Sequence, residues 1–178
     1  MTPEFSGVLL CFSGPVSCIL YRTVMGVCMG YIMDLRKIVG HRTLLQLGAS
    51  VIIEDSEGRI LLQKRTDNHT WSYAGGSVEP DESVEEAACR ECEEETGLIP
   101  DELVFLGIYS GKHMHYIYPN GDEVSNVDVV FICRKWHGTM KKQEEEVEEL
   151  RFFAKEELPE NIFFTERQAV QDWKEGKA

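Results

Sequence analysis

The chain has 178 residues, of which 43% are hydrophobic and 28% are charged. This length and composition are typical of one globular domain with a sizeable core. The formal net charge of −13 disfavours binding to nucleic-acid polymers and anionic membranes, because both require basic surface. The same charge repels a phosphorylated small molecule unless a metal cation mediates the contact.

Residues 1–32 are apolar and rich in small side chains, and we expect an N-terminal extension outside the fold, followed by one folded domain at residues 33–178. The first basic residue is Arg22, whereas a signal peptide begins with positive charge. The uncharged run at residues 5–21 is shorter than the roughly 20 residues that span a bilayer. We therefore expect no membrane partner and a cytoplasmic location. The sequence leaves open whether the native protein contains residues 1–32.

The folded part alternates strand patterns with turn signals, and its periodicity changes to that of a helix at two places. The sequence Asn120-Gly121 between two apolar runs predicts a hairpin with a type I′ turn. The predicted elements are a short amphipathic segment at 34–39, strands at 50–54, 59–65, 103–109, 114–118, 124–133 and 150–153, and a terminal helix at 161–174.

One helix is predicted most clearly, beginning after Ser83 and ending at Gly97. Ser83 and Glu86 have the spacing of a capping box, and glycine suits the left-handed residue that ends a helix. An apolar stripe at i, i+4 and i+8 predicts the buried face. Its members are Val84, Ala88 and Cys92.

The last turn of this helix carries four carboxylates within residues 91–95. Acids at a helix C-terminus are disfavoured by the helix dipole, and acids three or four residues apart repel one another. Glu91, Glu94 and Glu95 are related by i, i+3 and i+4, so their carboxylates share one face. Such clustered oxygen ligands suit Mg²⁺ or Mn²⁺. The alternative interpretation is a solvated acidic face without a ligand.

The helix also contains Cys89 and Cys92, which form a Cys-x-x-Cys spacing. A zinc site would need two further ligands at suitable spacing, and the six cysteines of the chain show no such framework. We favour reduced thiols, with Cys92 pointing into the core.

The full pattern runs from Gly76 to Leu98, reading GSVEPDESVEEAACRECEEETGL. It resembles the signature of the Nudix hydrolase family at every fixed position, with Cys92 standing where the family usually has an aliphatic residue. The resemblance implies an α/β fold, an α/β/α sandwich with a mixed β-sheet between helices. It also implies a Mg²⁺-dependent hydrolase, with Mn²⁺ as a substitute, that acts on a nucleoside diphosphate linked to another moiety.

The resemblance also implies roles for the residues at the matching positions. Glu91, Glu94 and Glu95 match the positions that hold metal, and one of them acts as the general base. The backbone carbonyl of Gly76 is a further candidate ligand. Arg90 is expected to orient the glutamates by bidentate pairing. The number of metal ions and the identity of the general base stay open.

Residues outside the motif complete the predicted site. Glu145 and Glu146 are candidates for an additional acid, against the simpler interpretation of solvated loop charges. Arg65 is a candidate phosphate ligand, against a surface charge at a strand end.

Three aromatic residues near the motif are candidates for substrate binding, since nucleobases stack on aromatic rings. Aromatic residues in strands also serve as core or sheet surface. The candidates are Trp71, Tyr73 and Tyr116.

The sequence therefore predicts a hydrolase that cleaves a pyrophosphate linkage by attack of a metal-activated water. Its substrate would be a nucleoside triphosphate, ADP-ribose or a dinucleoside polyphosphate. The alternative is a non-catalytic domain of the same fold that senses nucleotides or binds a protein partner. The exact substrate and the oligomeric state are open, although similar enzymes form homodimers.

Overall fold

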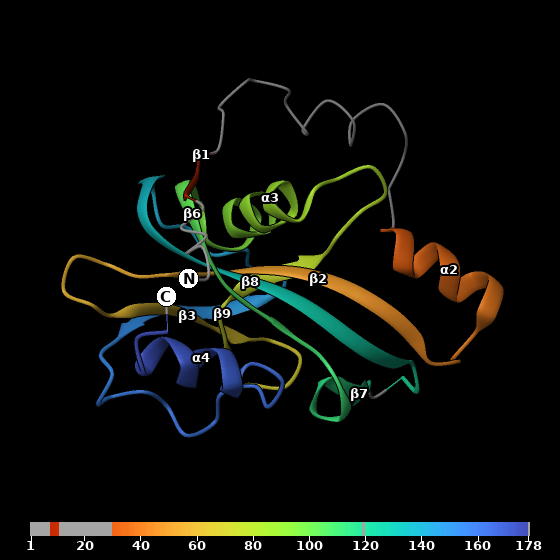
Figure 1. The fold of residues 1–178 in the computed structure, drawn as a ribbon. Coiled ribbons are helices and arrows are strands. Elements are labelled where there is room, and N and C mark those ends of the chain that lie inside the picture. Colours follow the sequence, from red (N-terminus) through yellow and green to blue (C-terminus); the bar gives the residue numbers. More distant parts are fainter. Residues whose placement is uncertain (1–7, 11–29, 119, 178) are drawn as a thin grey trace, which may run out of the picture.

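Two long strands, β2 (Leu44–Ile53) and β8 (Glu123–Gly138), run parallel at the centre of the main sheet in the computed structural model, which describes residues 8–10, 30–118 and 120–177 (Figure 1). Val51, Ile52 and Ile53 at the end of β2 are almost fully buried. Continuous burial of this kind is expected where both faces of a sheet are covered.

The main sheet has six strands in the order β1-β6-β8-β2-β5, with β7 paired to β8. A second sheet of three antiparallel strands has the order β4-β3-β9. The other strands of the main sheet are β1 (Val8–Leu10), β5 (Ala74–Ser77), β6 (Leu98–Tyr109) and β7 (His115–Ile117). The second sheet consists of β3 (Ile60–Arg65), β4 (Trp71–Ser72) and β9 (Val147–Phe153).

Helices lie on both sides of the strands, so the layers are helix, sheet and helix (Figure 1). The helix α3 (Val84–Thr96) packs on one face, where its Ala88 and Cys92 join a buried core cluster. The helix α4 (Arg167–Lys174) packs on the other face, where Trp173 joins a second cluster. The predicted α/β class with a mixed sheet between helices is confirmed.

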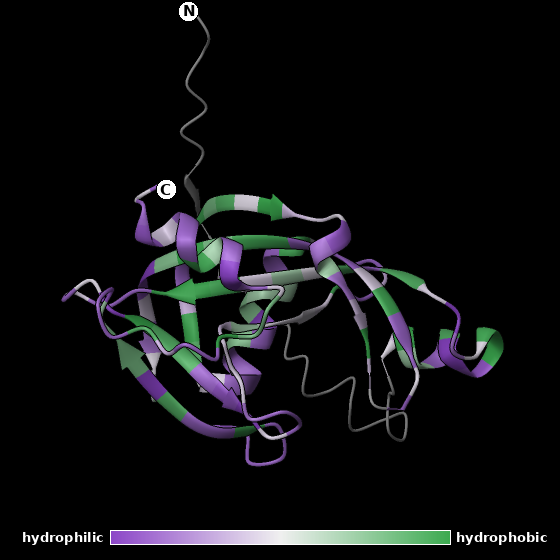
Figure 2. Ribbon diagram, turned by 90° about the horizontal axis from the view of Figure 1, so that it is seen from below, coloured by the Kyte–Doolittle hydropathy of each residue, from purple (hydrophilic) through white to green (hydrophobic). Residues whose placement is uncertain are grey.

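Hydrophobic segments concentrate along the central strands, and hydrophilic segments occupy the loops (Figure 2). The described elements also include α2 (Tyr31–Val39) and a 3₁₀ turn at Lys112–Met114. None of the helices in the described ranges has the length and apolar character needed to cross a bilayer.

The start of the fold differs from the predicted boundary at residue 33. The strand β1 pairs antiparallel with β6, with Val8 opposite Val104, so residues 8–10 belong to the main sheet. The helix α2 begins at Tyr31. Residues 1–7 and 11–29 lie outside the described residues, and for them the predicted extension stays a prediction.

Several element ends also differ from the sequence-based prediction. β6 begins at Leu98 rather than residue 103, and β8 continues to Gly138 along an exposed stretch. The terminal helix is shorter than residues 161–174.

The predicted type I′ turn between β7 and β8 is wrong. The N–H of Gly121 donates to the carbonyl of Tyr118 at 2.8 Å, so the turn begins one residue earlier than predicted. Gly121 has a φ of 86°, whereas Asn120 is not among the described residues with positive φ. A type I′ turn requires positive φ at both central residues.

Candidate active site

The helix α3 is fixed at both ends by the predicted caps. The Ser83 hydroxyl accepts the N–H of Glu86 at 3.2 Å, and the Glu86 carboxylate accepts the N–H of Ser83 at 2.9 Å. Gly97 ends the helix with a φ of 72°. A cap of this kind contributes about 1 kcal/mol, so the acidic last turn is held in helical form despite its repulsion.

The strand β5 approaches α3 very closely at Gly76. A Cβ atom at this position would lie 2.4 Å from the carboxylate of Glu91. Real Cβ atoms do not come so close to other atoms, so only glycine permits this contact. The absent side chain therefore brings the Glu91 carboxylate against the backbone of β5.

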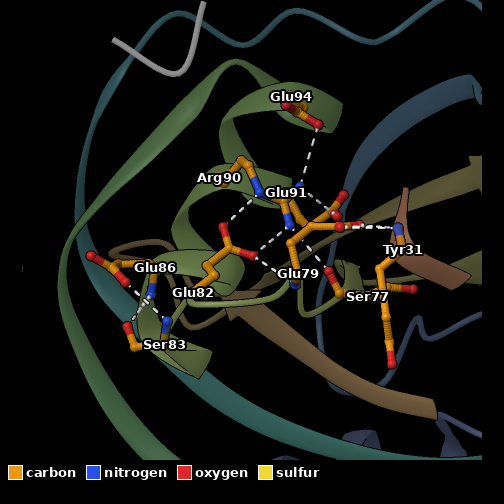
Figure 3. Close-up of polar contacts among 9 residues, drawn as sticks. All are labelled: Tyr31, Ser77, Glu79, Glu82, Ser83, Glu86, Arg90, Glu91 and Glu94. Atoms are coloured by element: carbon orange, nitrogen blue, oxygen red, sulfur yellow. Dashed lines mark hydrogen bonds and ion pairs between the residues drawn. The ribbon is translucent and has the colours of Figure 1, made fainter. Parts of the chain in front are cut away.

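Arg90 binds the carboxylates around it through its whole guanidinium group (Figure 3). Its Nε and Nη2 donate to Glu82 at 2.7 and 3.0 Å, and its Nη1 donates to Glu91 at 2.7 Å. The carboxylate of Glu94 lies 3.6 Å from Nη1. Nη2 also donates to the carbonyl of Ser77 on β5 at 3.1 Å. Arg90 thus contacts Glu91 and Glu94, although its bidentate pairing is with Glu82.

Glu95 is the most deeply buried of the three glutamates, with 6% of its surface exposed. Its carboxylate accepts the N–H of Gly75 at 2.9 Å. Burial, together with the charge of Glu91, raises the pKa of Glu95 to about 8. The pKa of Glu91 is also raised, chiefly by burial and further by the charge of Glu94, whereas Arg90 opposes the shift. The carboxylate of Glu91 is therefore close enough to those of Glu94 and Glu95 for the charges to repel.

The donor atoms of this site are of the kind that Mg²⁺ and Mn²⁺ prefer. Glu91, Glu94 and Glu95 offer carboxylate oxygens, and Gly76 offers a backbone carbonyl beside them. Within the described ranges, no three acidic, histidine or cysteine side chains are grouped so that they could hold a metal ion without rearranging. The guanidinium of Arg90 lies among the carboxylates. The residues fit a divalent cation by the chemistry of their oxygen atoms, and binding one requires the carboxylates to rearrange.

The NUDIX domain family matches residues 44–173 of the chain. The protein belongs to the Nudix hydrolase family. An ADP-ribose pyrophosphatase from Methanocaldococcus jannaschii is 34% identical over 154 residues, which cover 79% of this chain and 86% of that protein. A putative 8-oxo-dGTP diphosphatase from Bacillus subtilis is 47% identical over 62 residues, 35% of this chain and 42% of that protein. A MutT NUDIX hydrolase structure from Burkholderia pseudomallei has a TM-score of 0.62 and 28% identity, covering 72% of this chain and 98% of that one.

The loop before β9 lies against the end of the Nudix helix. The N–H of Gln143 donates to the carbonyl of Glu95 at 3.2 Å, and the N–H of Lys141 donates to that of Thr96 at 2.7 Å. The charge of Glu146 contributes to the raised pKa of both Glu91 and Glu95. Glu145 and Glu146 are both exposed. Of the two predicted additional acids, Glu146 is the one whose charge acts on the Nudix carboxylates.

Arg65 has a carboxylate partner of its own. Its Nε and Nη2 each donate to Asp67 at 2.9 Å. Its guanidinium also lies over the ring of Phe163, 5.4 Å from the centroid. The charge of Arg65 is therefore already matched by a carboxylate, which weakens its prediction as a phosphate ligand.

The structure buries two of the three predicted substrate-binding aromatic residues. Trp71 is 6% exposed and packs edge-on against Phe153, and Tyr73 is 3% exposed. Neither ring presents a free face for stacking in this structure, in contrast to the prediction.

Tyr116, the third predicted aromatic residue, is half-buried in a cluster at the surface. Its ring centroid lies 4.8 Å from that of Tyr118, 5.4 Å from that of Phe163 and 5.7 Å from that of the exposed Phe164. The role of Tyr116 in substrate binding stays a prediction, and its cluster offers aromatic surface that is partly exposed.

Two acids near the site were not predicted from the sequence. Asp128 is 9% exposed and accepts hydrogen bonds from Ser50 at 2.9 Å and from the Tyr73 hydroxyl at 3.2 Å. Glu166 accepts the backbone N–H of Tyr73 at 2.8 Å, and burial raises its pKa. An aspartate inside the apolar run of β8 is a signal that could have identified Asp128, whereas the surroundings of Glu166 in the sequence contain no such signal.

Proposed function

We propose that this Nudix hydrolase uses Mg²⁺, with Mn²⁺ as a substitute, to hydrolyse the pyrophosphate linkage of a nucleoside diphosphate joined to another moiety. The observation that carries the proposal is the set of three carboxylates on the last turns of α3, of which Glu91 and Glu95 lie against the glycine backbone of β5 and Glu94 pairs with Arg90. A bound divalent cation neutralises charge on the phosphoryl oxygens and lowers the pKa of water.

The residues of this chain then have distinct roles. Glu91, Glu94, Glu95 and the Gly76 carbonyl hold the cation, and one of the glutamates accepts a proton from the attacking water. Arg90 keeps the carboxylates in position.

Glu146 is proposed as the additional acid, because its charge already acts on Glu91 and Glu95. Tyr116 supplies stacking surface for the base through its aromatic cluster. Arg65 would reach phosphate only by leaving Asp67.

The substrate range follows from the relatives. Their names include ADP-ribose and 8-oxo-dGTP as substrates, so both kinds of nucleotide belong in the first panel tested. We further propose a cytoplasmic location and a homodimer.

Glu94→Gln tests the proposal most directly. This change removes one carboxylate charge from the set and keeps the size of the side chain. We expect hydrolysis of the best nucleotide with Mg²⁺ to fall by at least about 100-fold, the low end for losing a group that acts in proton transfer or charge stabilisation. Phosphate or nucleoside monophosphate release measures the effect, and circular dichroism shows whether the variant is folded.

Glu93→Gln is the matched control. Glu93 belongs to the same helical turn and is exposed, so its loss should leave activity within about twofold. Equal activity of the two folded variants would contradict the proposed role of Glu94. A protein that binds nucleotides and hydrolyses none of them would favour the non-catalytic alternative.

A further inference from the structure

Tyr73 lies at the point where the chain passes from one sheet to the other. β4 ends at Ser72 in the second sheet, and β5 begins at Ala74 in the main sheet. Tyr73 belongs to neither of the two sheets formed by the described residues, and it is 3% exposed. Leaving a buried backbone N–H without an acceptor is costly, so the N–H of Tyr73 needs a partner from another part of the chain.

The segment before α4 supplies this partner. The N–H of Trp71 donates to the carbonyl of Asn161 at 3.1 Å, and the N–H of Phe163 donates to the carbonyl of Trp71 at 2.8 Å. The segment then turns, with the N–H of Glu166 bonded to the carbonyl of Phe163 at 3.0 Å. At Tyr73 the acceptor is therefore a side chain, because the N–H of Tyr73 donates to the carboxylate of Glu166 at 2.8 Å.

The residues after Tyr73 carry groups of the proposed metal site. The N–H of Gly75 donates to the carboxylate of Glu95 at 2.9 Å, and the carbonyl of Gly76 is a proposed ligand. Successive residues of a strand are about 3.3 Å apart, so Gly75 lies within about 7 Å of Tyr73. Glu95 belongs to α3 and Glu166 directly precedes α4, and these helices lie on opposite faces of the sheet (Figure 1). The strand is thus held from both sides at alternate amides.

The strand has little space in which to move. A Cβ atom at Gly75 would lie 2.1 Å from the hydroxyl of Ser50, and one at Gly76 would lie 2.4 Å from the carboxylate of Glu91. A closely packed interior transmits a displacement to its neighbours instead of absorbing it. A shift at Tyr73 would therefore reach the two glycines.

We propose that Glu166 is a positioning residue for the metal site, because it holds the N–H of Tyr73 and thereby fixes the strand that presents Gly75 and Gly76 to α3. The inference rests on the proposed function. Glu166 acts through the strand and contacts neither the cation nor the reacting atoms. Mg²⁺ demands near-ideal octahedral geometry, so its affinity is the property that depends most on this placement.

The first test is Glu166→Met, which removes the acceptor and keeps a side chain of similar length. Calorimetric titration of MgCl₂ into the full-length, nucleotide-free protein measures Kd. We expect Kd to rise by at least about tenfold, as for the loss of other groups that orient metal ligands. Glu166→Gln keeps an oxygen that can accept the N–H, so its Kd should stay within about threefold of the wild-type value. An unchanged Kd in a folded Glu166→Met protein would overturn the inference.

Glu175→Met is the matched control. Glu175 directly follows α4, is exposed and accepts a hydrogen bond from the side chain of Gln171 at 2.8 Å. Its replacement removes the same charge from the other end of the helix and should leave Kd for Mg²⁺ unchanged. Equal weakening by Glu175→Met and Glu166→Met would show an effect of overall charge and would overturn the positioning role.

Amide hydrogen exchange follows the strand itself. In nucleotide-free Glu166→Met, the amides of Tyr73 and Gly75 should both exchange faster than in the wild-type protein, because the strand loses one of its fixed points. Faster exchange at Tyr73 alone would mean that the displacement does not reach the metal site, which contradicts the inference. If Glu166→Met does not fold, Glu166→Asp replaces it, since a carboxylate withdrawn by one methylene should also weaken Mg²⁺ binding.

Activity separates positioning from substrate binding. At saturating Mg²⁺, kcat of Glu166→Met should return to within about threefold of the wild-type value, because the excess of ion offsets the weaker site. A variant with normal Kd for Mg²⁺ and a raised KM for the nucleotide would make Glu166 a substrate-binding residue and would overturn the inference alone. If the wild-type protein neither binds Mg²⁺ nor hydrolyses any nucleotide, the proposed function fails as well.

Discussion

Asp128 is a buried acid whose pKa is raised by its surroundings in the folded protein. It lies in β8 between the half-buried Val127 and the buried Val129, and it accepts two hydrogen bonds, from Ser50 and Tyr73. Burial raises the pKa of Asp128, although both hydrogen bonds oppose this effect. The folded protein thus holds a proton on Asp128 more strongly than the unfolded chain does.

Asp128→Asn should therefore change how stability depends on pH. A raised pKa in the folded state means that stability falls as pH rises from the unfolded pKa of about 4 to the folded pKa, by up to about 1.4 kcal/mol per pH unit across that interval. The asparagine cannot ionise, so the variant should gain stability relative to the wild type as the pH rises from 4 to 8. Urea unfolding at the two pH values measures the difference.

Asp101→Asn provides the comparison for this experiment. Asp101 is exposed and pairs with His137 at the surface, so its loss should not reproduce the gain at pH 8. A stability difference between wild type and Asp128→Asn that does not grow from pH 4 to pH 8 would mean that burial does not raise the pKa of Asp128.

At the scale of single elements, α3 was the most predictable and the hairpin turn the least. Ser83, Glu86 and Gly97 act on their immediate neighbours in the chain, and the structure confirms both the capping box and the C-terminal cap. Local hydrogen bonds of this kind can be inferred from spacing alone. The general positions of the longer strands were also predictable from their apolar runs, whereas the short strands β1, β4 and β5 were not predicted.

The missed features depend on residues that are distant in the sequence. β6 begins five residues earlier than predicted because Leu98–Pro100 finds a partner in the end of β8. Trp71 is buried because Phe153, more than eighty residues later, packs against it. No local pattern reveals such partners.

The C-cap of α3 gives a prediction at this scale. A Cβ at Gly97 would lie 2.4 Å from the carbonyl oxygen of Thr139, and the residue has positive φ. Gly97→Ala should destabilise the protein by at least about 2 kcal/mol, because the left-handed conformation alone costs about 1–2 kcal/mol and the collision adds to it. Chemical denaturation measures the change.

Gly176→Ala is the matched control, since Gly176 has a φ of 73° and open space around the added Cβ. The Gly176→Ala variant should lose no more stability than the about 1–2 kcal/mol that the left-handed conformation costs. Equal losses in the two variants would show that the contact with Thr139 has no effect.

For the whole molecule, the dominant fact is the net charge of −13. Mutual repulsion among surface acids lowers the stability of the compact state, and salt screens that repulsion. A divalent cation bound by Glu91, Glu94 and Glu95 would act in addition to screening, because it binds only the folded chain.

Mg²⁺ should therefore stabilise the protein beyond an equal ionic strength of NaCl. At a concentration about 100 times Kd, the gain is about 2.7 kcal/mol, which raises Tm by about 5–10 °C for a chain of this length. Thermal unfolding with MgCl₂, with NaCl and with MgCl₂ plus EDTA measures it.

The Glu94→Gln variant should lose most of the increase in Tm that is specific to Mg²⁺. Its Tm should still respond to NaCl as that of the wild-type protein does. If both salts raise Tm of the wild-type protein equally, the acidic last turn of α3 binds no specific ion.

The pairing of Arg90 with Glu82, Glu91 and Glu94 has a consequence for assembly. The guanidinium serves as an internal counterion, so a newly synthesised chain can gather its acids before any ion arrives. Chelation should then leave a folded protein whose activity returns on simple addition of the ion, without a refolding delay.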